Sequence, residues 1–374
     1  MALVLNEEQG MLRDSVKAFL SERAPVAHLR KLRDSRDPVG FDRKLWLQFA
    51  EQGYSAVLVP EAHGGLALGA VEASIIAEAL GRTLTPTPFL STAVLAARAI
   101  ARAGSATQQA ELLPAIAAAE TVIALAVDET SKHRPGAIAA KATRDGSGWR
   151  LDGAKTFVLD GHVAERCIVA ARTAEGGLTL LLVDPRAAGV QIERTLMVDA
   201  HNAARLRFDG VRIGADALLG EAGAAGAVLD EVLDLGRVVV AAQLLGLADA
   251  VFELTLAYLK ERRQFERAIG EFQALQHRAA KLYIDIELTR ALVLGALQAM
   301  DADPAKAGLI VAQAKAHACT TANRAVQEGV QMHGGVGMTD EFDIGLYMKR
   351  ARTLQELLGD AGFHADRVAA MGGY

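Results

Sequence analysis

Apolar residues recur at helical spacing through the first third of the chain, over residues 6–119. The pattern changes over residues 121–213, where short β-type runs are separated by Gly, Asp and Pro. In residues 205–208, Leu and Phe alternate with two arginines, which predicts a strand with one buried face. Helical spacing returns from Ala224. The order predicts a small, largely antiparallel sheet or barrel between two helical regions.

The last helical region carries an apolar stripe over several turns, which predicts a helix bundle. The stripe consists of Leu275, Ala279, Leu282, Ile286 and Val293. In the first helical region we interpret Gly81 as a turn signal.

The composition sets the class of protein. A chain of 374 residues with 51% hydrophobic and 23% charged residues can bury two or three cores and is not disordered. Its formal charge of −5 provides no positive field for nucleic acid or an anionic membrane. Cys167 and Cys319 are far apart, which argues against a disulfide framework or structural zinc and favours a reducing, cytoplasmic compartment. Acidic residues near the start argue against a signal peptide, and no uncharged apolar run approaches about 18 residues.

Several common catalytic motifs are missing from the sequence. There is no GxGxxG, no HExxH and no GxSxG, and residues 153–156 lack the glycine that a P-loop places before its lysine. His63, His277 and His333 are interpreted as turn or helix residues. We therefore predict no Rossmann or P-loop chemistry and no metal site.

Two segments of the C-terminal half are unusual. Residues 258–277, YLKERRQFERAIGEFQALQH, place basic, amide and aromatic side chains beside a glycine. Residues 331–338, QMHGGVGM, contain paired glycines that can end a helix and let a partner backbone or a phosphate approach closely. Neither segment is specific by itself, and each also suits a solvated turn or a helix cap.

Taken in order with other segments, they resemble the acyl-CoA dehydrogenase family of flavoproteins over essentially the whole chain. The other segments are NEEQGMLRDSVKAFL, PEAHGG, AEALGRTLTPTPFL and DGAKTFV. The resemblance implies a mainly α protein with a middle β-domain, assembled as a dimer or tetramer around FAD. Its domains would be an N-terminal helical domain (1–120), a middle β-barrel or sandwich (121–222) and a C-terminal four-helix bundle (223–374).

The resemblance also assigns cofactor-binding residues. Arg262 would meet the FAD pyrophosphate, which suits a bidentate guanidinium. Gln331 and the Gly334–Gly335 pair would hold the adenosine end across a subunit interface, and Phe157 would lie against the flavin ring. The other implied cofactor-binding residues are Val127, Gln264, Phe265, Ile269 and Phe272.

Two positions depart from the family pattern near the expected flavin. Asp128 stands where the family often has a threonine that bonds the flavin, and Leu159 replaces another hydroxyl. A hydroxyl can donate a proton to the ring, whereas leucine cannot and an ionised carboxylate only accepts. Flavin affinity and redox tuning are therefore expected to differ from those of other members.

The implied reaction is α,β-dehydrogenation of an acyl-CoA thioester, which needs a desolvated carboxylate to remove the α-proton. The family supplies that carboxylate at one of two places, which match Leu358 and Gly236 here. Glu356 and Asp360 flank Leu358, but using either one needs a shift in register. Arg237 matches an arginine that the family keeps next to the second place, and we expect it to organise the site.

Helical geometry, at about 100° per residue, tests the acids near Gly236. Asp230, Glu231 and Asp234 all point away from its face, so we interpret them as a solvated first turn complementing the helix dipole. Asp234 is the least implausible candidate base among them. Gln243 shares the face of Gly236, but an amide is no base.

Two functions stay open. The first is an active FAD-dependent acyl-CoA dehydrogenase, most simply a homotetramer, that passes electrons to an electron-transfer flavoprotein. The alternative is a base-lacking partner subunit of a hetero-oligomeric acyl-CoA dehydrogenase. A weaker third possibility is a member diverted to flavin oxygenation or to thioester-free substrates. The sequence does not identify the acyl group.

Overall fold

The structure is a computed structural model that describes residues 3–374. It divides into two units. The helical unit contains residues up to Lys31, residues 70–85 and residues 237–374. The mixed unit contains residues 32–69 and 86–236.

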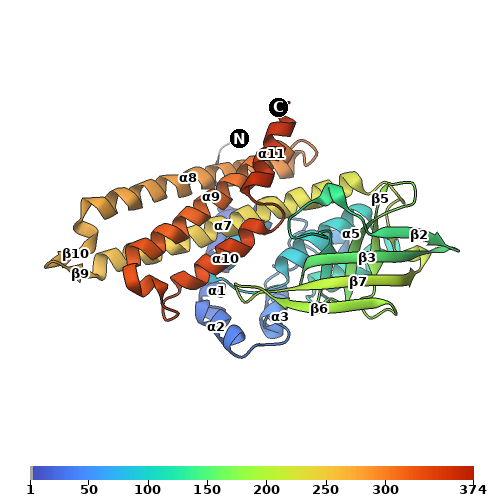
Figure 1. The fold of residues 1–374 in the computed structure, drawn as a ribbon, viewed down its shortest axis with the longest axis horizontal. Coiled ribbons are helices and arrows are strands. Elements are labelled where there is room, and N and C mark those ends of the chain that lie inside the picture. The colour runs from blue at the N-terminus through green and yellow to red at the C-terminus, as the bar shows by residue number, and fades with distance from the viewer. Residues whose placement is uncertain (1–2) are drawn as a thin grey trace. The chain divides into compact units, whose positions relative to one another are not determined.

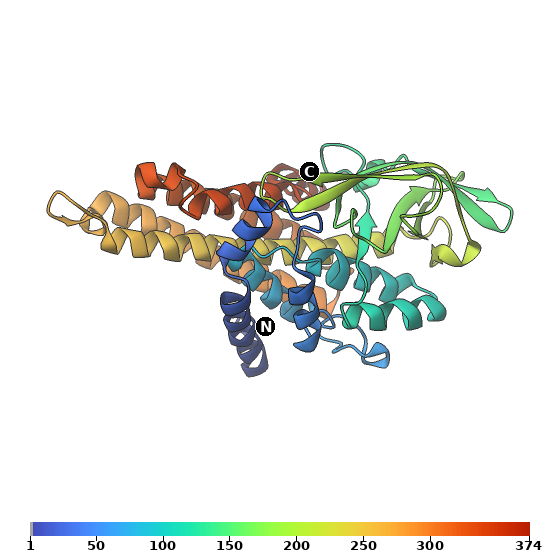
Figure 2. The same cartoon turned by 90° about the horizontal axis from the view of Figure 1, so that it is seen from below.

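The helical unit is built from long α-helices joined by short connections, with one small hairpin (Figures 1 and 2). Its elements are α1 (Glu7–Arg23), α4 (Ala70–Thr83), the greater part of α7 (Gly226–Glu261), β9 (Arg263–Gln264), β10 (Arg267–Ala268), α8 (Gln273–Ala302), α9 (Gly308–His333), α10 (Ile344–Glu356) and α11 (Ala361–Met371). α9 packs against α8, α10 and α11, as expected of a bundle.

The predicted stripe of α8 is confirmed. Ala279, Leu282, Ile286 and Val293 are buried, and Leu275, near the start of the helix, is half-buried. Burial of this face against neighbouring helices gives a helix of this length most of its stability in a protein.

α4 and α7 cross at direct backbone contact. A Cβ atom on Gly81 would lie 2.1 Å from the carbonyl oxygen of Gln243, and one on Gly246 would lie 2.0 Å from that of Glu78. Gly246 is in the interior of α7, where glycine costs about 1 kcal/mol relative to alanine, and Gly81 is in the last turn of α4. The interpretation of Gly81 as a turn signal is therefore wrong, because its role is to let two helices approach.

The mixed unit combines short helices with a β-sheet. The helices are α3 (Arg43–Glu51), the π-helical segment η2 (Phe89–Ala96), α5 (Ala97–Ala103) and α6 (Ala106–Ala117). α2 (Val26–Asp34) lies across the boundary between the units in the sequence. The strands are β1 (Ile123–Ala126), β2 (Lys141–Asp145), β3 (Gly148–Leu159), β4 (Arg166–Arg172), β5 (Leu178–Val183), β6 (Val190–Leu196), β7 (Asn202–Ile213) and β8 (Leu218–Leu219).

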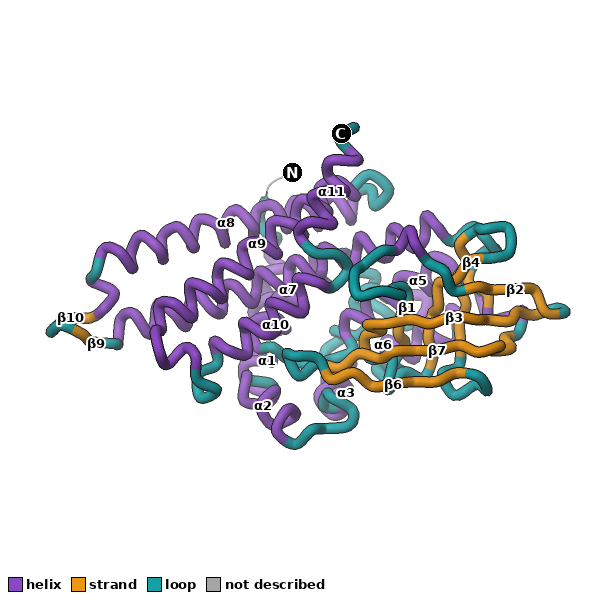
Figure 3. The backbone as a smooth tube through the Cα atoms, in the orientation of Figure 1, coloured by secondary structure: helices purple, strands orange, loops and turns teal. Residues whose placement is uncertain are grey.

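The sheet has the strand order β6-β7-β3-β2-β4-β5-β8, with β1 added beside β4. Figure 3 shows β6, β7, β3 and β2 side by side. Its pairs are antiparallel except β1–β4 and β2–β4. Leu206 and Phe208 are buried while Arg205 and Arg207 are exposed, so the predicted alternation is confirmed. The expected small, largely antiparallel sheet is confirmed with it.

The pairing of β3 with β7 is interrupted between Lys155 and Val158. Phe157 lies in this irregularity with φ of 51°, a left-handed conformation that is rare for an aromatic residue. The irregularity leaves 46% of Phe157 exposed.

α7 is long and apolar enough to cross a membrane by length and composition, but 78% of its most apolar window is buried inside the protein. That degree of burial is typical of a core helix. The two cysteines are also buried, Cys167 in β4 and Cys319 in α9. Burial raises the pKa of Cys167 to about 12, so its thiol stays protonated at neutral pH.

Candidate functional site

The mixed unit carries a recess of about 640 Å³ on the face of the sheet formed by β3, β6 and β7. Phe157 is an exposed aromatic side chain in its lining. The other lining residues include Glu129, Thr130, Ser131, Lys155, Thr156, Gln191, Glu193, Arg205 and Arg207. An exposed aromatic face among hydrogen-bonding side chains can receive a flat, polar-edged ring.

Lys155 supports one side of this recess from a buried position. Its ammonium donates to the carboxylate of Glu129 at 2.7 Å and to the carbonyl oxygen of Val127 at 3.0 Å. Burial lowers the pKa of Lys155, although the bond to Glu129 works against this. Burial also opposes ionisation of Glu129, but bonds from Lys155 and from the amides of Ala140 and Ala139 outweigh it and hold its pKa below the usual value. The pair fixes the segment after β1, and Val127 contributes its carbonyl to that pair.

The two departures from the family pattern are Asp128, within this segment, and Leu159, at the end of β3. The carboxylate of Asp128 lies 2.9 and 3.0 Å from Nδ1 of His133. The carbonyl oxygen of Asp128 accepts from the amide of Thr156 at 2.7 Å. Leu159 is half-buried at the end of β3. Asp128 is therefore held by its own neighbours, and neither side chain offers a hydroxyl.

In the helical unit, the β9–β10 hairpin projects beyond the ends of α7 and α8 (Figure 2). Phe265 is 85% exposed at its tip and contacts Phe272 edge-on, with ring centroids 6.2 Å apart. Arg262 and Gln264 are exposed, and Ile269 is half-buried. These residues form a surface that the rest of the unit leaves uncovered.

The second unusual segment lies at the same end of the bundle. The rings of Tyr258, near the end of α7, and His333, at the end of α9, stack with centroids 4.5 Å apart. Gln331, Gly334 and Gly335 are exposed. Gly334 has φ of 64° and caps α9, and a Cβ on either glycine would meet no atom within 4 Å. The space beside both glycines is open to a partner or a ligand.

The acids at the start of α7 are not a solvated first turn, so that interpretation is wrong. α7 begins at Gly226, which places these acids beyond the first turn. Asp234 is buried at 5% exposure. Glu231 forms ion pairs with Arg98 at 3.7 Å and Arg102 at 3.1 Å. Only Asp230 is exposed.

Leu358 lies in the turn between α10 and α11 and is buried, with φ of 58°. Its carbonyl oxygen accepts from Nε of Arg237 at 3.3 Å and lies 3.2 Å from Nε2 of His364. Because a carbonyl only accepts, His364 carries its proton on Nε2 in this contact. Arg237 therefore organises the backbone at this position, while the side chain there is apolar.

A buried lysine holds the same turn from α9. Nζ of Lys315 lies 3.2, 3.3 and 2.9 Å from the carbonyl oxygens of Leu354, Gln355 and Gly359. A cation there also complements the negative end of the α10 dipole. Burial lowers the pKa of Lys315. The turn is thus tied by donors from α7, α9 and α11.

The two acids that flank Leu358 are engaged elsewhere. Glu356 forms an ion pair with Arg352 at 2.9 Å. Asp360 caps α11 by accepting from the amide of Phe363 at 2.8 Å. Both carboxylates therefore already have structural partners in the turn as it is observed.

Sequence reasoning missed Lys155, Lys315 and His364. The signal available for Lys315 was a single lysine among alanines at helical spacing, which indicates a buried position for a charged side chain. Lys155 lies in a strand whose alternation is interrupted, so its burial could not be read from the pattern.

Three family models match the chain in order. They are "Acyl-CoA dehydrogenase, N-terminal domain" over residues 6–120, "Acyl-CoA dehydrogenase, middle domain" over 127–211 and "Acyl-CoA dehydrogenase, C-terminal domain" over 225–372. Acyl-CoA dehydrogenase IpdE2 of Mycolicibacterium smegmatis is 32% identical over 357 residues, which is 95% of this chain and 96% of that protein. Acyl-CoA dehydrogenase FadE27 of Mycobacterium tuberculosis is 30% identical over 88% of this chain and 87% of its own length.

Solved structures of acyl-CoA dehydrogenases are similar to this chain over nearly its whole length. A variant of the Tcur3481–Tcur3483 steroid ACAD is 32% identical with a TM-score of 0.90, covering 98% of both chains. The ChsE4–ChsE5 complex of Mycobacterium tuberculosis is 28% identical with a TM-score of 0.92, covering 100% of this chain and 99% of that one. The fold class expected from the sequence, mainly α with a middle β-domain, is confirmed.

Proposed function

This chain belongs to the acyl-CoA dehydrogenase family, and on that premise we propose that it is the base-lacking partner subunit of a hetero-oligomeric acyl-CoA dehydrogenase. Members of the family are FAD-dependent oxidoreductases. Family membership therefore confirms the enzyme class and the cofactor that the sequence predicts. The observation that carries the proposal is the buried Leu358, whose turn is tied by three helices although its side chain cannot accept a proton.

The assembly would catalyse α,β-dehydrogenation of an acyl-CoA thioester. A carboxylate of the partner subunit removes the α-proton. FAD, when bound, would supply the acceptor for the β-hydrogen, and an electron-transfer flavoprotein would take up the electrons. This chain would contribute its exposed hairpin, with Arg262 on the pyrophosphate, and the surface of Gln331, Gly334 and Gly335 at the adenosine end.

The recess of the mixed unit suits a flavin in shape but not fully in chemistry. Phe157 presents an aromatic face, and Thr156 and Lys155 lie beside it. Asp128 and Leu159 supply no hydroxyl to the ring edge. We therefore propose that flavin binds this chain's own recess weakly and that the partner's site holds most of the cofactor.

Two comparisons support a hetero-oligomer and suggest a substrate class. The ChsE4–ChsE5 complex and the Tcur3481–Tcur3483 steroid ACAD are each named as a pair of proteins. Since the second is named for steroid substrates, ring-bearing acyl-CoA thioesters are the first class to test.

The test is expression of the chain alone and together with a homologue that has a glutamate at the position of Leu358. We expect the chain alone to hold little flavin, and the pair to co-elute on size exclusion, to carry FAD and to be bleached anaerobically by an acyl-CoA. A stable homotetramer with full flavin occupancy that an acyl-CoA bleaches would contradict the proposal.

The second candidate is an active homo-oligomer in which Asp234 is the base, and the burial of that side chain favours it. One matched pair of variants separates the two functions. In the co-expressed assembly, Arg262→Ala should lower flavin occupancy under either function. In the chain expressed alone, which is the assembly of the second function, Asp234→Asn should lower the rate of anaerobic flavin bleaching about 10²–10⁴-fold if Asp234 is the base. An unchanged rate in Asp234→Asn would exclude the second candidate.

A further inference from the structure

The helical unit contains a separate cavity of about 770 Å³ between α1, α4, α7 and α8. None of its lining residues belongs to the recess of the mixed unit. Its α4 wall follows one face of the helix, at intervals of three or four residues. That wall consists of Val71, Ser74, Ile75, Glu78, Ala79 and Arg82.

The cavity has an apolar end and a charged end. Arg290 of α8 bonds Glu78, while Asp301, later in α8, bonds the amide of Ala70 at the start of α4. The two helices therefore run antiparallel. Leu294, one turn beyond Arg290, lies toward the apolar part of the α4 wall.

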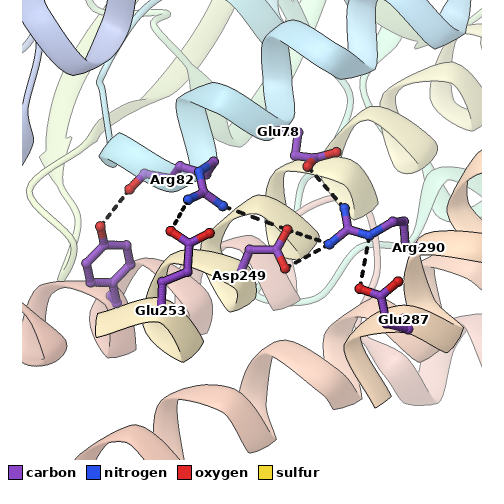
Figure 4. A network of polar contacts seen from close by, with 7 residues as sticks. Glu78, Arg82, Asp249, Glu253, Glu287 and Arg290 are labelled. Atoms are coloured by element: carbon purple, nitrogen blue, oxygen red, sulfur yellow. Dashed lines mark hydrogen bonds and ion pairs between the residues drawn. The ribbon is translucent and has the colours of Figure 1, made fainter. Parts of the chain in front are cut away.

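The charged end is a network of ion pairs centred on Arg290 (Figure 4). Its Nε lies 3.3 Å from Glu287, its Nη1 lies 3.3 Å from Glu78 and its Nη2 lies 2.7 Å from Asp249. All three nitrogens of this guanidinium are already engaged with carboxylates.

The other arginines near this end are engaged as well. Arg82 pairs with Asp249 at 3.8 Å and with Glu253 (Figure 4). Arg13 of α1 pairs with Asp14 through Nε and Nη2, both at 2.9 Å. The network in Figure 4 therefore sets two guanidinium groups against four carboxylates. Lys17 lines the cavity from α1 as an exposed side chain.

Ser74 is the polar group on the α4 wall that the protein leaves unsatisfied. It is 1% exposed, and its hydroxyl oxygen is buried without a hydrogen-bond partner. Such a group destabilises the folded chain unless a ligand or water satisfies it. Glu78 lies one turn further along the same face, and 28% of its side chain remains accessible.

We propose that this cavity binds an amphipathic amine, with its ammonium between Ser74 and Glu78 and its apolar tail toward Ile75 and Leu294. Carboxylate and hydroxyl oxygens accept hydrogen bonds from an ammonium, which has donors only. An anionic head group would be repelled by these carboxylates, because the nearby guanidinium nitrogens already form ion pairs with them. Burial raises the pKa of Glu78, and Asp249 adds to this, so a cation here relieves a desolvated and crowded carboxylate.

The experiment titrates the full chain by calorimetry with n-octylamine, n-octanol and octanoate, each kept below its micelle concentration. We expect saturable binding of one octylamine per chain, at least about tenfold weaker binding of octanol and no binding of octanoate. Equal affinity for octylamine and octanol, preferential binding of octanoate or no binding of octylamine would overturn the proposal.

Variants locate the head group. Glu78→Gln should weaken octylamine at least about tenfold, and Ser74→Ala should also weaken it about tenfold or more, through the loss of one hydrogen bond from a charged donor. Glu61→Gln, an exposed acid of the mixed unit, is the matched control and should bind octylamine like the wild type. If Glu78→Gln fails to fold, the affinity of Ser74→Ala tests the proposal. This substitution removes only one oxygen from a small side chain, so the fold should be kept. Unchanged affinity in Ser74→Ala and, where it folds, in Glu78→Gln would overturn the proposal.

Discussion

The burial of His364 makes the stability of this protein depend on pH. The side chain is 0% exposed in α11, and its Nδ1 is buried without a partner. Burial, then the charges of Lys315 and Arg237, lower its pKa to about 2. In the unfolded chain the pKa returns to about 6.5. Because the folded pKa is depressed, the stability linked to His364 is present above pH of about 6.5 and is lost as the pH falls.

The magnitude follows from the protons that only the unfolded chain binds. Between about pH 7.5 and about pH 5, the free energy of unfolding falls by about 2 kcal/mol. This is about 1.36 kcal/mol for each of the roughly 1.5 pH units that lie below the unfolded pKa of about 6.5. The result is insensitive to the folded pKa, because any value below about 4 leaves the ring neutral over this range.

His364→Gln tests this reasoning, since the glutamine amide can still donate to the carbonyl oxygen of Leu358 but does not titrate. Urea unfolding at the two pH values should show the wild type losing about 2 kcal/mol more than His364→Gln on acidification. His277→Gln, at an exposed histidine of α8, measures the general effect of removing one imidazole. Equal losses in the wild type and in His364→Gln would refute the argument.

Two further predictions concern stability and are checked by urea unfolding at neutral pH. Gly81→Ala should cost about 3 kcal/mol or more, because its Cβ would lie 2.1 Å from the Gln243 oxygen, whereas Gly10→Ala in α1, with nothing within 4 Å, should gain up to about 1 kcal/mol. Similar losses in both variants would contradict the close crossing of α4 and α7. Lys155→Met should cost about 3 kcal/mol by stranding the Glu129 carboxylate, and adding Glu129→Gln should restore most of it. A double variant no more stable than Lys155→Met would argue against the pair.

The sequence predicts those parts of the fold that depend on local periodicity. The strand face at Leu206 and Phe208 and the buried stripe of α8 follow from apolar spacing alone, because each face is selected by burial along one element. The prediction for Gly81 is wrong because a glycine in a turn and a glycine at a helix crossing cannot be distinguished from the neighbouring sequence alone. The distinction depends on Gln243, more than 150 residues away in the sequence.

The site was less predictable because its charges depend on distant partners. Glu231 pairs with arginines of α5, which no pattern near Glu231 reveals. The missing base at Leu358 could be inferred from the family resemblance, but the convergence of Arg237, His364 and Lys315 on its turn could not, since these residues come from three different helices. The roles of the predicted cofactor residues stay predictions.

The burial of both native cysteines has a practical consequence for spectroscopy. Cys167 lies within the sheet and Cys319 is 3% exposed in α9. A thiol-reactive spin label or fluorophore should therefore attach only slowly to the native chain, because the reagent needs an accessible thiolate. One cysteine introduced at the exposed tip of the β9–β10 hairpin could be labelled selectively without first replacing the native pair. Such a label would report directly on when that tip becomes covered during assembly.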